Sequence, residues 1–269
     1  MNATLSLIVA AGLLATPSPA ASVGQAVTVE LRSADGRELP FYPAPGQGGD
    51  HRVYAEAVQG SEYHIVVHNH LGRRVGLVIA VDGRNIVSGA KSWLGSGERM
   101  YILDPYGTQE YDGWRTGQDR VNRFYFTSAG DSYAAAFDDT SAMGVVAVAV
   151  YAEFQPPLPV RPHRIGCNAP AGASAAAGMA APAPSCRAEA KKTLATPSAQ
   201  DEAGTGYGPE EYSPCITVAF QPEAQAREKS FIKYEWRNTL CRMGILRNPP
   251  PVNRMWNDAG FAPPPPGRR

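Results

Sequence analysis

The sequence has little cysteine, and it has no long apolar run after its N-terminus. Its 269 residues include four cysteines, none of which precedes Cys167. No two of them have the C-x-x-C spacing that is typical of zinc sites, which argues against a cysteine-bound metal. No later segment is long and apolar enough to cross a bilayer as a helix. We therefore expect no transmembrane span in the mature chain.

The sequence also lacks the short fingerprints of common enzyme classes. It has no Gly-x-Ser-x-Gly motif for a serine nucleophile and no EF-hand spacing for calcium. The stretch Gly204-Thr-Gly-Tyr-Gly208 lacks the lysine of a phosphate-binding loop and the spacing of a dinucleotide motif, so it is predicted to be a turn. We expect no cofactor and no catalytic residue.

Charge of neither sign dominates the chain. Lys and Arg number 25, as do Asp and Glu, and the formal net charge is zero. Proteins that bind the phosphates of nucleic acids usually carry a clustered excess of basic residues. The sequence therefore predicts no nucleic-acid partner.

The N-terminus has the order of features found in a signal peptide. An apolar stretch from Leu5 to Ala15 is followed by Ser18 and Ala20, small residues that fit a cleavage site after Ala20. No Lys or Arg precedes this stretch, so a membrane anchor is the competing interpretation, but the stretch is too short to span a bilayer comfortably. We predict a signal peptide over residues 1–20 and a periplasmic or extracellular protein.

Export gives the even number of cysteines a meaning, because disulfides form and persist in oxidising compartments. Four cysteines allow three pairings, and the sequence cannot choose among them. The most local pairing joins Cys167 to Cys186 and Cys215 to Cys241. All four lie late in the chain, so the first domain is expected to fold by packing alone.

Two stretches are expected to form the centre of the fold. Val75 to Val81 is nearly continuously apolar, which is typical of a strand covered on both faces, and Asp82-Gly83 predicts a tight turn after it. The apolar run from Gly144 to Phe154 is its expected partner. Just before them, polar residues alternate with three apolar ones that are predicted to face the core: Tyr63, Ile65 and Val67.

Further short strands are expected over much of the first 155 residues. They are predicted at 25–33, 38–42, 52–58, 99–103, 109–115, 121–128 and 132–137. About eight short strands with turns between them are typical of an antiparallel β-sandwich with immunoglobulin-like or jelly-roll-like connections. We therefore predict an all-β fold for residues 21–155.

Composition divides the rest of the chain. Residues 156–203 are rich in Ala, Pro, Gly and Ser and poor in large apolar residues, which predicts a flexible linker. Residues 204–269 are predicted to be a small β-rich extension that ends in a proline-rich tail. This extension has strand-like stretches at 215–220 and 230–236 and a helical turn near 238–245. It either folds alone or adds strands to the sandwich.

Four segments carry a resemblance to a known group of proteins. They are LVIAVDGRNIVSG, ILDPYGTQEYDGWR, GVVAVAVYAEF and the GTGYG…KYEWR…FAPPPP tail. Together they resemble a family of uncharacterised exported bacterial β-rich proteins, over most of the mature chain except the linker. That family has no established activity, so the resemblance implies an exported β-rich fold and nothing more.

Three histidines form the sharpest candidate for a metal site. His64, His68 and His70 have the same parity, so on a regular strand their side chains leave one face. Histidines two apart on a strand can hold zinc with a third ligand from elsewhere, such as Glu62 or His51. Because the opposite face is expected to be buried, a solvated row of histidines is the favoured interpretation.

Aromatic residues concentrate between Trp93 and Phe126. Exposed rings on a rigid scaffold can stack on sugar faces, although large rings more often fill the core. The candidate ligand-binding residues are Trp93, Tyr111, Trp114 and Arg115. The function that follows is an exported, non-catalytic β-sandwich module that binds a protein or glycan partner at the cell envelope or outside the cell. The alternatives are a metal-dependent hydrolase that uses the histidine strand, and a purely structural envelope component.

Overall fold

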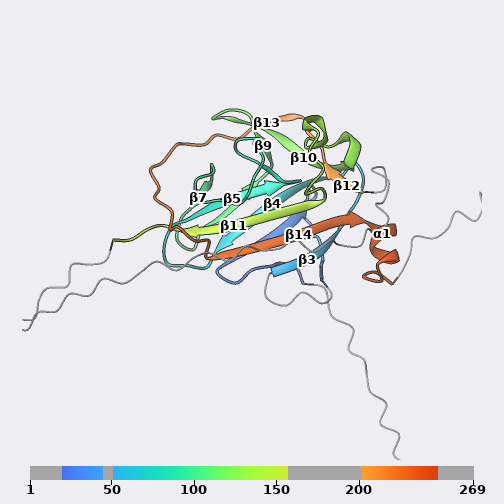
Figure 1. The fold of residues 1–269 in the computed structure, drawn as a ribbon, viewed down its shortest axis with the longest axis horizontal. Helices are drawn as coiled ribbons and strands as arrows, with labels where there is room; N and C mark the ends of the chain where they lie inside the picture. The colour runs from blue at the N-terminus through green and yellow to red at the C-terminus, as the bar shows by residue number, and fades with distance from the viewer. Residues whose placement is uncertain (1–19, 45–50, 157–201, 248–269) are drawn as a thin grey trace, which may run out of the picture. The chain divides into compact units, whose positions relative to one another are not determined.

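The computed structural model describes residues 20–44, 51–156 and 202–247. The chain divides into two units, of which one holds Met1–Phe154 with Pro197–Arg269 and the other holds Gln155–Thr196. Every strand of the described residues belongs to the first unit. These strands form two sheets with one main hydrophobic core between them (Figure 1). The predicted all-β sandwich is confirmed.

The first sheet is built around two long strands that pair with each other. Its main strands, in spatial order, are β1 (Val27–Ser33), β4 (Glu62–Asn69), β10 (Arg120–Ser128) and β12 (Ala203–Thr205). Three shorter strands extend it from β4 and β10: β8 (Thr108–Tyr111), β9 (Gly113–Arg115) and β13 (Glu210–Tyr212). All of these pairs are antiparallel.

The second sheet contains the most apolar strands. In spatial order the strands of this sheet are β2 (Phe41–Pro43), β3 (His51–Ala57), β14 (Glu228–Trp236), β11 (Val145–Ala152), β5 (Val75–Val81) and β6 (Arg84–Asn85). A further short strand, β7 (Tyr101–Leu103), also pairs with β5. β3 and β14 run parallel, whereas the other pairs in this sheet are antiparallel.

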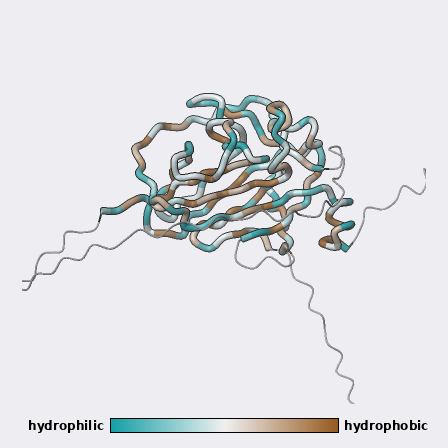
Figure 2. The backbone as a smooth tube through the Cα atoms, viewed as in Figure 1, coloured by the Kyte–Doolittle hydropathy of each residue, from teal (hydrophilic) through white to brown (hydrophobic). Residues whose placement is uncertain are grey.

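The pairing of β5 with β11 confirms the expectation drawn from their apolar runs. All seven residues of β5 are buried. Leu77 and Ile79 face the main core, while Val78 faces outward and is covered by Leu94 and Met100. Both faces of β5 are therefore removed from water, which explains its unbroken apolar sequence. Figure 2 shows hydrophobic residues along these central strands.

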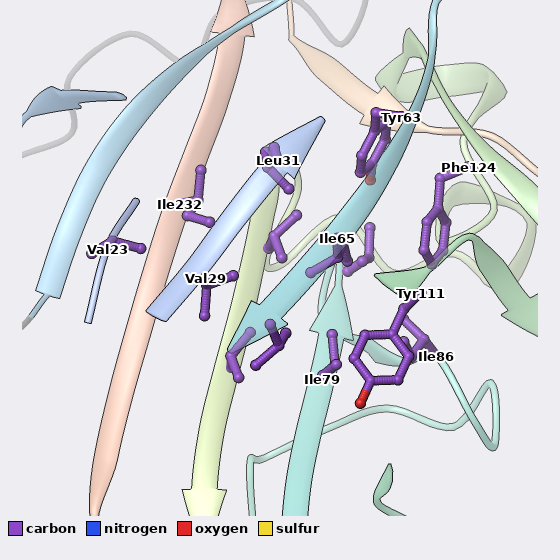
Figure 3. Close-up of a cluster of buried hydrophobic side chains, with 14 of the residues drawn as sticks. Val23, Val29, Leu31, Tyr63, Ile65, Ile79, Ile86, Tyr111, Phe124 and Ile232 are labelled. Carbon is purple, nitrogen blue, oxygen red and sulfur yellow. The ribbon is translucent and has the colours of Figure 1, made fainter. Parts of the chain in front are cut away.

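The core between the sheets is filled by side chains that alternate along their strands. On β4, Tyr63, Ile65 and Val67 are fully buried, as the alternating pattern predicts. Figure 3 shows Leu31 from β1 and Ile232 from β14 in the same cluster, so both sheets contribute to it. Burial of these large side chains is the main source of stability for a domain with no cysteine in its first 155 residues.

The tight turn predicted at Asp82-Gly83 joins β5 to β6. Val81 pairs with Arg84 across it, and Asp82 and Gly83 have φ values of 49° and 77°. Two consecutive residues with positive φ are characteristic of a type I′ hairpin turn, in which Gly is favoured and Asp is tolerated. The turn also sets the side chain of Asp82 inside the protein, where it is completely buried.

A buried polar network links the two sheets through Asp82. Its carboxylate accepts hydrogen bonds from the backbone N–H of Gly144 at 2.8 Å, the backbone N–H of Thr205 at 2.7 Å and the hydroxyl of Tyr234 at 2.6 Å. The hydroxyl of Thr205 also lies 2.6 Å from that of Tyr234 and 2.8 Å from that of Tyr63. Because Tyr234 gives its proton to Asp82, it must accept from Thr205, which in turn accepts from Tyr63. Burial raises the pKa of Asp82 to about 6. The hydrogen bonds that the Asp82 carboxylate accepts act in the opposite direction and lower this pKa.

The residues after 201 contribute strands to both sheets. β12 and β13 pair with β10 in the first sheet, and β14 lies between β3 and β11 in the second. The helical turn predicted near 238–245 is present as α1 (Arg237–Arg242), and Gly244 follows it with a φ of 74°. The small extension expected from the sequence thus supplies strands to the sandwich.

Three local predictions are wrong. Residues 132–137 do not form an edge strand: they follow the 3-10 turn η1 (Ala129–Asp131) and include a second one, η2 (Ala135–Phe137). The Ser132 hydroxyl donates to the carbonyl of Ala129 and accepts from the N–H of Ala135, which favours a turn. Residues 215–220 pair with no strand, and Ile216 is 85% exposed. Residues 203–205, expected partly as a turn, form β12.

Several predictions lie outside the described residues. These are the signal peptide except for Ala20, most of the linker, the proline-rich tail, and the cysteines at 167 and 186. Cys215 and Cys241 are free thiols in the structure, so the most local of the three possible pairings, which joins them, is not formed in it. Within the described part of the chain, no helix has the length and apolarity needed to span a membrane.

Candidate functional site

A pocket of about 460 Å³ opens where β9, the η1–η2 segment and the residues after β12 meet. We call it the aromatic pocket. Its rings come from segments far apart in the sequence: Trp114, Tyr125, Tyr133, Phe137 and Tyr207. Polar side chains line it as well: Ser88, Arg115, Thr116, Asp131 and Ser132. A concave site with several rings and a few polar groups is typical of a small-ligand site.

Tyr133 is the centre of the ring cluster. Its ring centroid lies 4.4 Å from Trp114, 5.1 Å from Phe137 and 5.5 Å from Tyr207. The ring of Tyr207 is stacked on that of Tyr133, with 16° between their planes. Trp114 is only 2% exposed, whereas Phe137 is 50% and Tyr207 is 46% exposed. The cluster therefore has a buried base and two rings that face solvent.

Hydrogen bonds hold this cluster in place. The indole N–H of Trp114 donates to the carbonyl oxygen of Gly206 at 3.0 Å, which connects β9 to the residues that follow β12. The side-chain amide of Asn122 donates to the carbonyl oxygen of Gly208 at 2.7 Å. These bonds fix the main chain on both sides of Tyr207. The exposed ring therefore projects from backbone that is tied to the sheet.

The approach of β9 to β10 depends on Gly113. A Cβ atom at this position would lie 2.0 Å from the carbonyl oxygen of Asn122, which belongs to the backbone of the neighbouring strand. We expect Gly113→Ala to lower the free energy of unfolding by about 2–3 kcal/mol, because main-chain atoms must move apart to relieve the overlap. Gly117→Ala is the matched control, since its Cβ would have ordinary contacts only. Denaturant unfolding of both variants measures the difference, and equal stability would contradict this role.

Of the four predicted ligand-binding residues, two line the aromatic pocket. Trp114 and Arg115 lie side by side in its wall. Trp93 is 79% exposed and lies outside the residues that line the pocket. Tyr111 is buried against Tyr101, with 4.5 Å between ring centroids, and burial raises the pKa of its hydroxyl. Tyr111 thus belongs mainly to the core.

Arg115 has a structural role besides lining the pocket. Its Nε donates to the hydroxyl of Tyr101 at 2.9 Å, and its terminal nitrogens donate to the hydroxyl and carbonyl oxygens of Ser213. It also lines a second, larger groove of about 1060 Å³, which runs between β7 to β9 and residues 213–222. We call this the large groove. Arg115 therefore separates two concave regions of the surface.

Sequence reasoning named Trp114 as a candidate but none of the other four rings of the pocket. Tyr125 lies in a predicted strand, Tyr133 and Phe137 in a predicted edge strand, and Tyr207 in a predicted turn. The only sequence signal for Tyr207 is its position between Gly206 and Gly208, where small residues allow close approach of neighbouring groups. A Cβ atom on Gly206 would overlap the ring of Tyr125, and a Cβ atom on Gly208 would contact the same ring.

The three predicted histidines do not come together as one metal site. His64 Nδ1 lies 2.9 Å from a carboxylate oxygen of Asp112. His68 hydrogen-bonds the hydroxyl of Thr108, and His70 that of Thr28 at 3.0 Å. The rings of His68 and His70 contact each other, with 4.6 Å between centroids.

The suggested third ligands for these histidines are also engaged elsewhere. Glu62 forms an ion pair with Arg123 at 3.1 Å, and His51 lies 2.8 Å from Glu228. In contrast, Glu110 and Asp112 both approach His64. The hydrogen bond to Asp112 raises the pKa of His64, although partial burial opposes this.

Comparison of this chain with family models, with curated proteins and with solved structures found no match. The resemblance suggested by the four sequence segments therefore stays a prediction. Any functional assignment must come from the geometry of the surface, and the aromatic pocket is the site where rings and polar groups converge.

Proposed function

We propose that the protein is an exported, non-catalytic module that binds a glycan in the aromatic pocket. The observation that carries this proposal is the pair of half-exposed rings, Phe137 and Tyr207, that project from the partly buried cluster around Tyr133. An aromatic face suits the apolar C–H face of a sugar ring, and stacking on it releases water. The pocket volume also lies in the range of small-ligand sites, about 300–1,000 Å³.

The polar groups of the pocket supply the second half of sugar recognition. Sugar hydroxyls need both donors and acceptors when they leave water, because an unpaired buried hydroxyl is costly. Asp131 offers carboxylate oxygens, and Ser88 and Thr116 offer hydroxyls that serve in either role. Asp131 accepts one hydrogen bond from Ser128 at 2.7 Å, which orients its carboxylate and leaves other lone pairs for a ligand.

The sequence predicts either a protein or a glycan partner. A small, concave and ring-lined site favours the glycan. Protein interfaces of standard size bury about 800 Å² on each partner, which requires a broad contact area. The exposed rings of the pocket are instead confined to one small region. Export is consistent with a glycan partner at the cell envelope or outside the cell, and it rests on the N-terminal sequence alone.

A glycan array with the purified mature chain tests the proposal. We expect binding to a restricted set of glycans, and we expect Tyr207→Ala and Phe137→Ala each to weaken it about tenfold or more, which corresponds to ~1.4 kcal/mol or more of lost stacking. Trp93→Ala is the matched control, because it removes an exposed ring that does not line the pocket. Unchanged binding by both pocket variants, or loss only with Trp93→Ala, would reject the aromatic pocket as the site.

A further inference from the structure

A histidine and two carboxylates meet on the outer face of the first sheet. His64 is on β4, Glu110 is on β8, and Asp112 follows β8 directly. β8 pairs with β4 so that Ile65 lies opposite Tyr111, and both of these side chains are buried. Since side chains alternate along a strand, the neighbours of those two residues point to the opposite face. The strand register alone thus brings the imidazole and both carboxylates together.

The donor atoms of these three residues have the separations that a small metal ion needs. All three lie within 4.8 Å of one another. His64 Nδ1 is 2.9 Å from Asp112 Oδ1 and 3.8 Å from Glu110 Oε1. Zinc binds imidazole nitrogen and carboxylate oxygen at about 2.0–2.2 Å, so donors in a tetrahedral site are separated by about 3.3 Å. The two observed distances bracket this value.

The charges around the cluster favour a cation. In the described part of the chain, His64 is the basic group that contacts Glu110 and Asp112. Two carboxylates and one imidazole nitrogen thus converge on one point of the surface, and a divalent ion held there would interact favourably with both acidic groups.

Two arginines on the strands that flank β4 are held by other acids. Arg123 binds Glu211 at 2.8 Å and Glu62 at 3.1 Å. Arg32 lies opposite His64 across the β1–β4 pair, and its guanidinium contacts Glu30 at 2.8 Å and Glu38 at 3.6 Å. Both of these arginines are therefore engaged with acids other than Glu110 and Asp112.

We propose that His64, Glu110 and Asp112 bind a divalent metal ion of the zinc type. One imidazole nitrogen with two carboxylate oxygens is a donor set that suits Zn²⁺ and its transition-metal neighbours, whereas Ca²⁺ and Mg²⁺ prefer oxygen ligands only. Three protein ligands leave a coordination position for water or a ligand. This site is independent of the proposed glycan site, because none of its three residues lines the aromatic pocket.

The position of the cluster suggests what the metal would serve. Glu110 and Asp112 also line the large groove, so an ion bound to them lies at its edge. A ligand in the groove that carries a carboxylate, phosphate or other oxygen donor could complete the coordination of the ion.

Calorimetric titration of the full mature chain with zinc sulfate, with its thiols alkylated, tests the proposal. We expect one equivalent of zinc to bind, and we expect His64→Gln and Asp112→Asn each to weaken binding at least about tenfold. Both substitutions preserve side-chain size, and thermal unfolding confirms that the variants fold. His68→Gln is the matched control, because His68 is on the same strand but outside the cluster. The same titration with calcium chloride is expected to show much weaker binding.

Several outcomes would overturn the proposal. Zinc binding that survives both His64→Gln and Asp112→Asn would exclude the cluster as the site. Loss of binding with His68→Gln alone would assign the metal to the contacting rings of His68 and His70 instead. Tighter binding of calcium than of zinc, or no binding of zinc, would contradict the proposed donor set. None of these results depends on glycan binding, so the two proposals succeed or fail separately.

Discussion

Replacement of Asp82 by alanine is expected to lower the free energy of unfolding by about 3–5 kcal/mol. The substitution leaves three buried donors without an acceptor: the N–H groups of Gly144 and Thr205 and the hydroxyl of Tyr234. Each unpaired buried group costs about 1–3 kcal/mol. Removal of a buried negative charge offsets part of this loss. Alanine at a φ of 49° adds about 1–2 kcal/mol of backbone strain.

Asp82→Asn is the matched control for this prediction. Asparagine tolerates a positive φ and keeps one oxygen acceptor, but its amide nitrogen must face a backbone N–H that also donates. We expect it to lose roughly half as much stability as the alanine variant. Chemical denaturation of the two variants and the parent chain measures these differences. If alanine were tolerated as well as asparagine, the hydrogen bonds to Asp82 would not be what stabilises the junction of the two sheets.

The raised pKa of Asp82 also predicts a pH dependence with a definite sign. Burial raises this pKa to about 6 from the ordinary value of 3.8, so the folded protein binds the proton more tightly than the unfolded chain does. The stability from this group is fully present below pH 3.8 and is lost as the pH rises through about 6. The shift corresponds to about 3 kcal/mol. The difference in stability between the parent and Asp82→Asn should therefore depend on pH between these values.

Carboxylates elsewhere act in the opposite direction, so the comparison with Asp82→Asn is needed. Hydrogen bonds from Ser141 and Lys91 lower the pKa of Asp139 to about 2, and the hydrogen bonds from Arg74 lower that of Glu153. Groups of this kind lose their stabilising effect as the pH falls through their folded pKa. Subtraction of the two stability profiles removes these shared contributions. A difference that does not change with pH would contradict the assignment of the raised pKa to Asp82.

The strands of the fold could be predicted because their patterns are local. The continuous apolar sequence of β5 predicts burial of both faces, and the alternation along β4 predicts a buried face that carries Tyr63, Ile65 and Val67. The structure agrees in both cases. Asp82-Gly83 was recognisable as a turn because few residue pairs adopt two positive φ values. What these patterns could not give is the role of the Asp82 side chain, since its partners lie far away in the sequence.

The candidate sites could be predicted only in part, because they depend on long-range pairing. Trp114 was identified, yet its neighbours Tyr133 and Tyr207 come from segments whose local pattern is weak. His64 was also named, but it was grouped with His68 and His70 rather than with Asp112. Parity along one strand joined it to His68, whereas the register between β4 and β8 joins it to Asp112. Register between strands distant in sequence is not encoded in the pattern of either strand alone.

Removal of residues 202–269 is expected to abolish folding of the remaining chain. β14 lies between β3 and β11, so its loss exposes the unpaired edges of two strands in the middle of the sheet. It also takes Ile232 and Tyr234 out of the core, where each is almost fully buried. Truncation of one such core side chain costs about 2–5 kcal/mol. The loss of two, about 4–10 kcal/mol, together with both strand pairings, is comparable to the total stability of a typical domain, about 5–15 kcal/mol.

Fragment complementation is the sharpest way to measure this effect. A fragment of residues 21–156 should aggregate or lack a cooperative thermal transition when it is expressed alone, and co-expression with residues 197–247 should restore both solubility and the transition. Ile232→Asp in the second fragment is the control, because a buried carboxylate at this position prevents docking of β14 without changing its length. A cooperative transition in the first fragment alone would show that β3 and β11 can close the sheet without β14. The first 155 residues would then be an independent domain. They would be stable despite the two strand edges and the part of the core that the loss of β14 exposes.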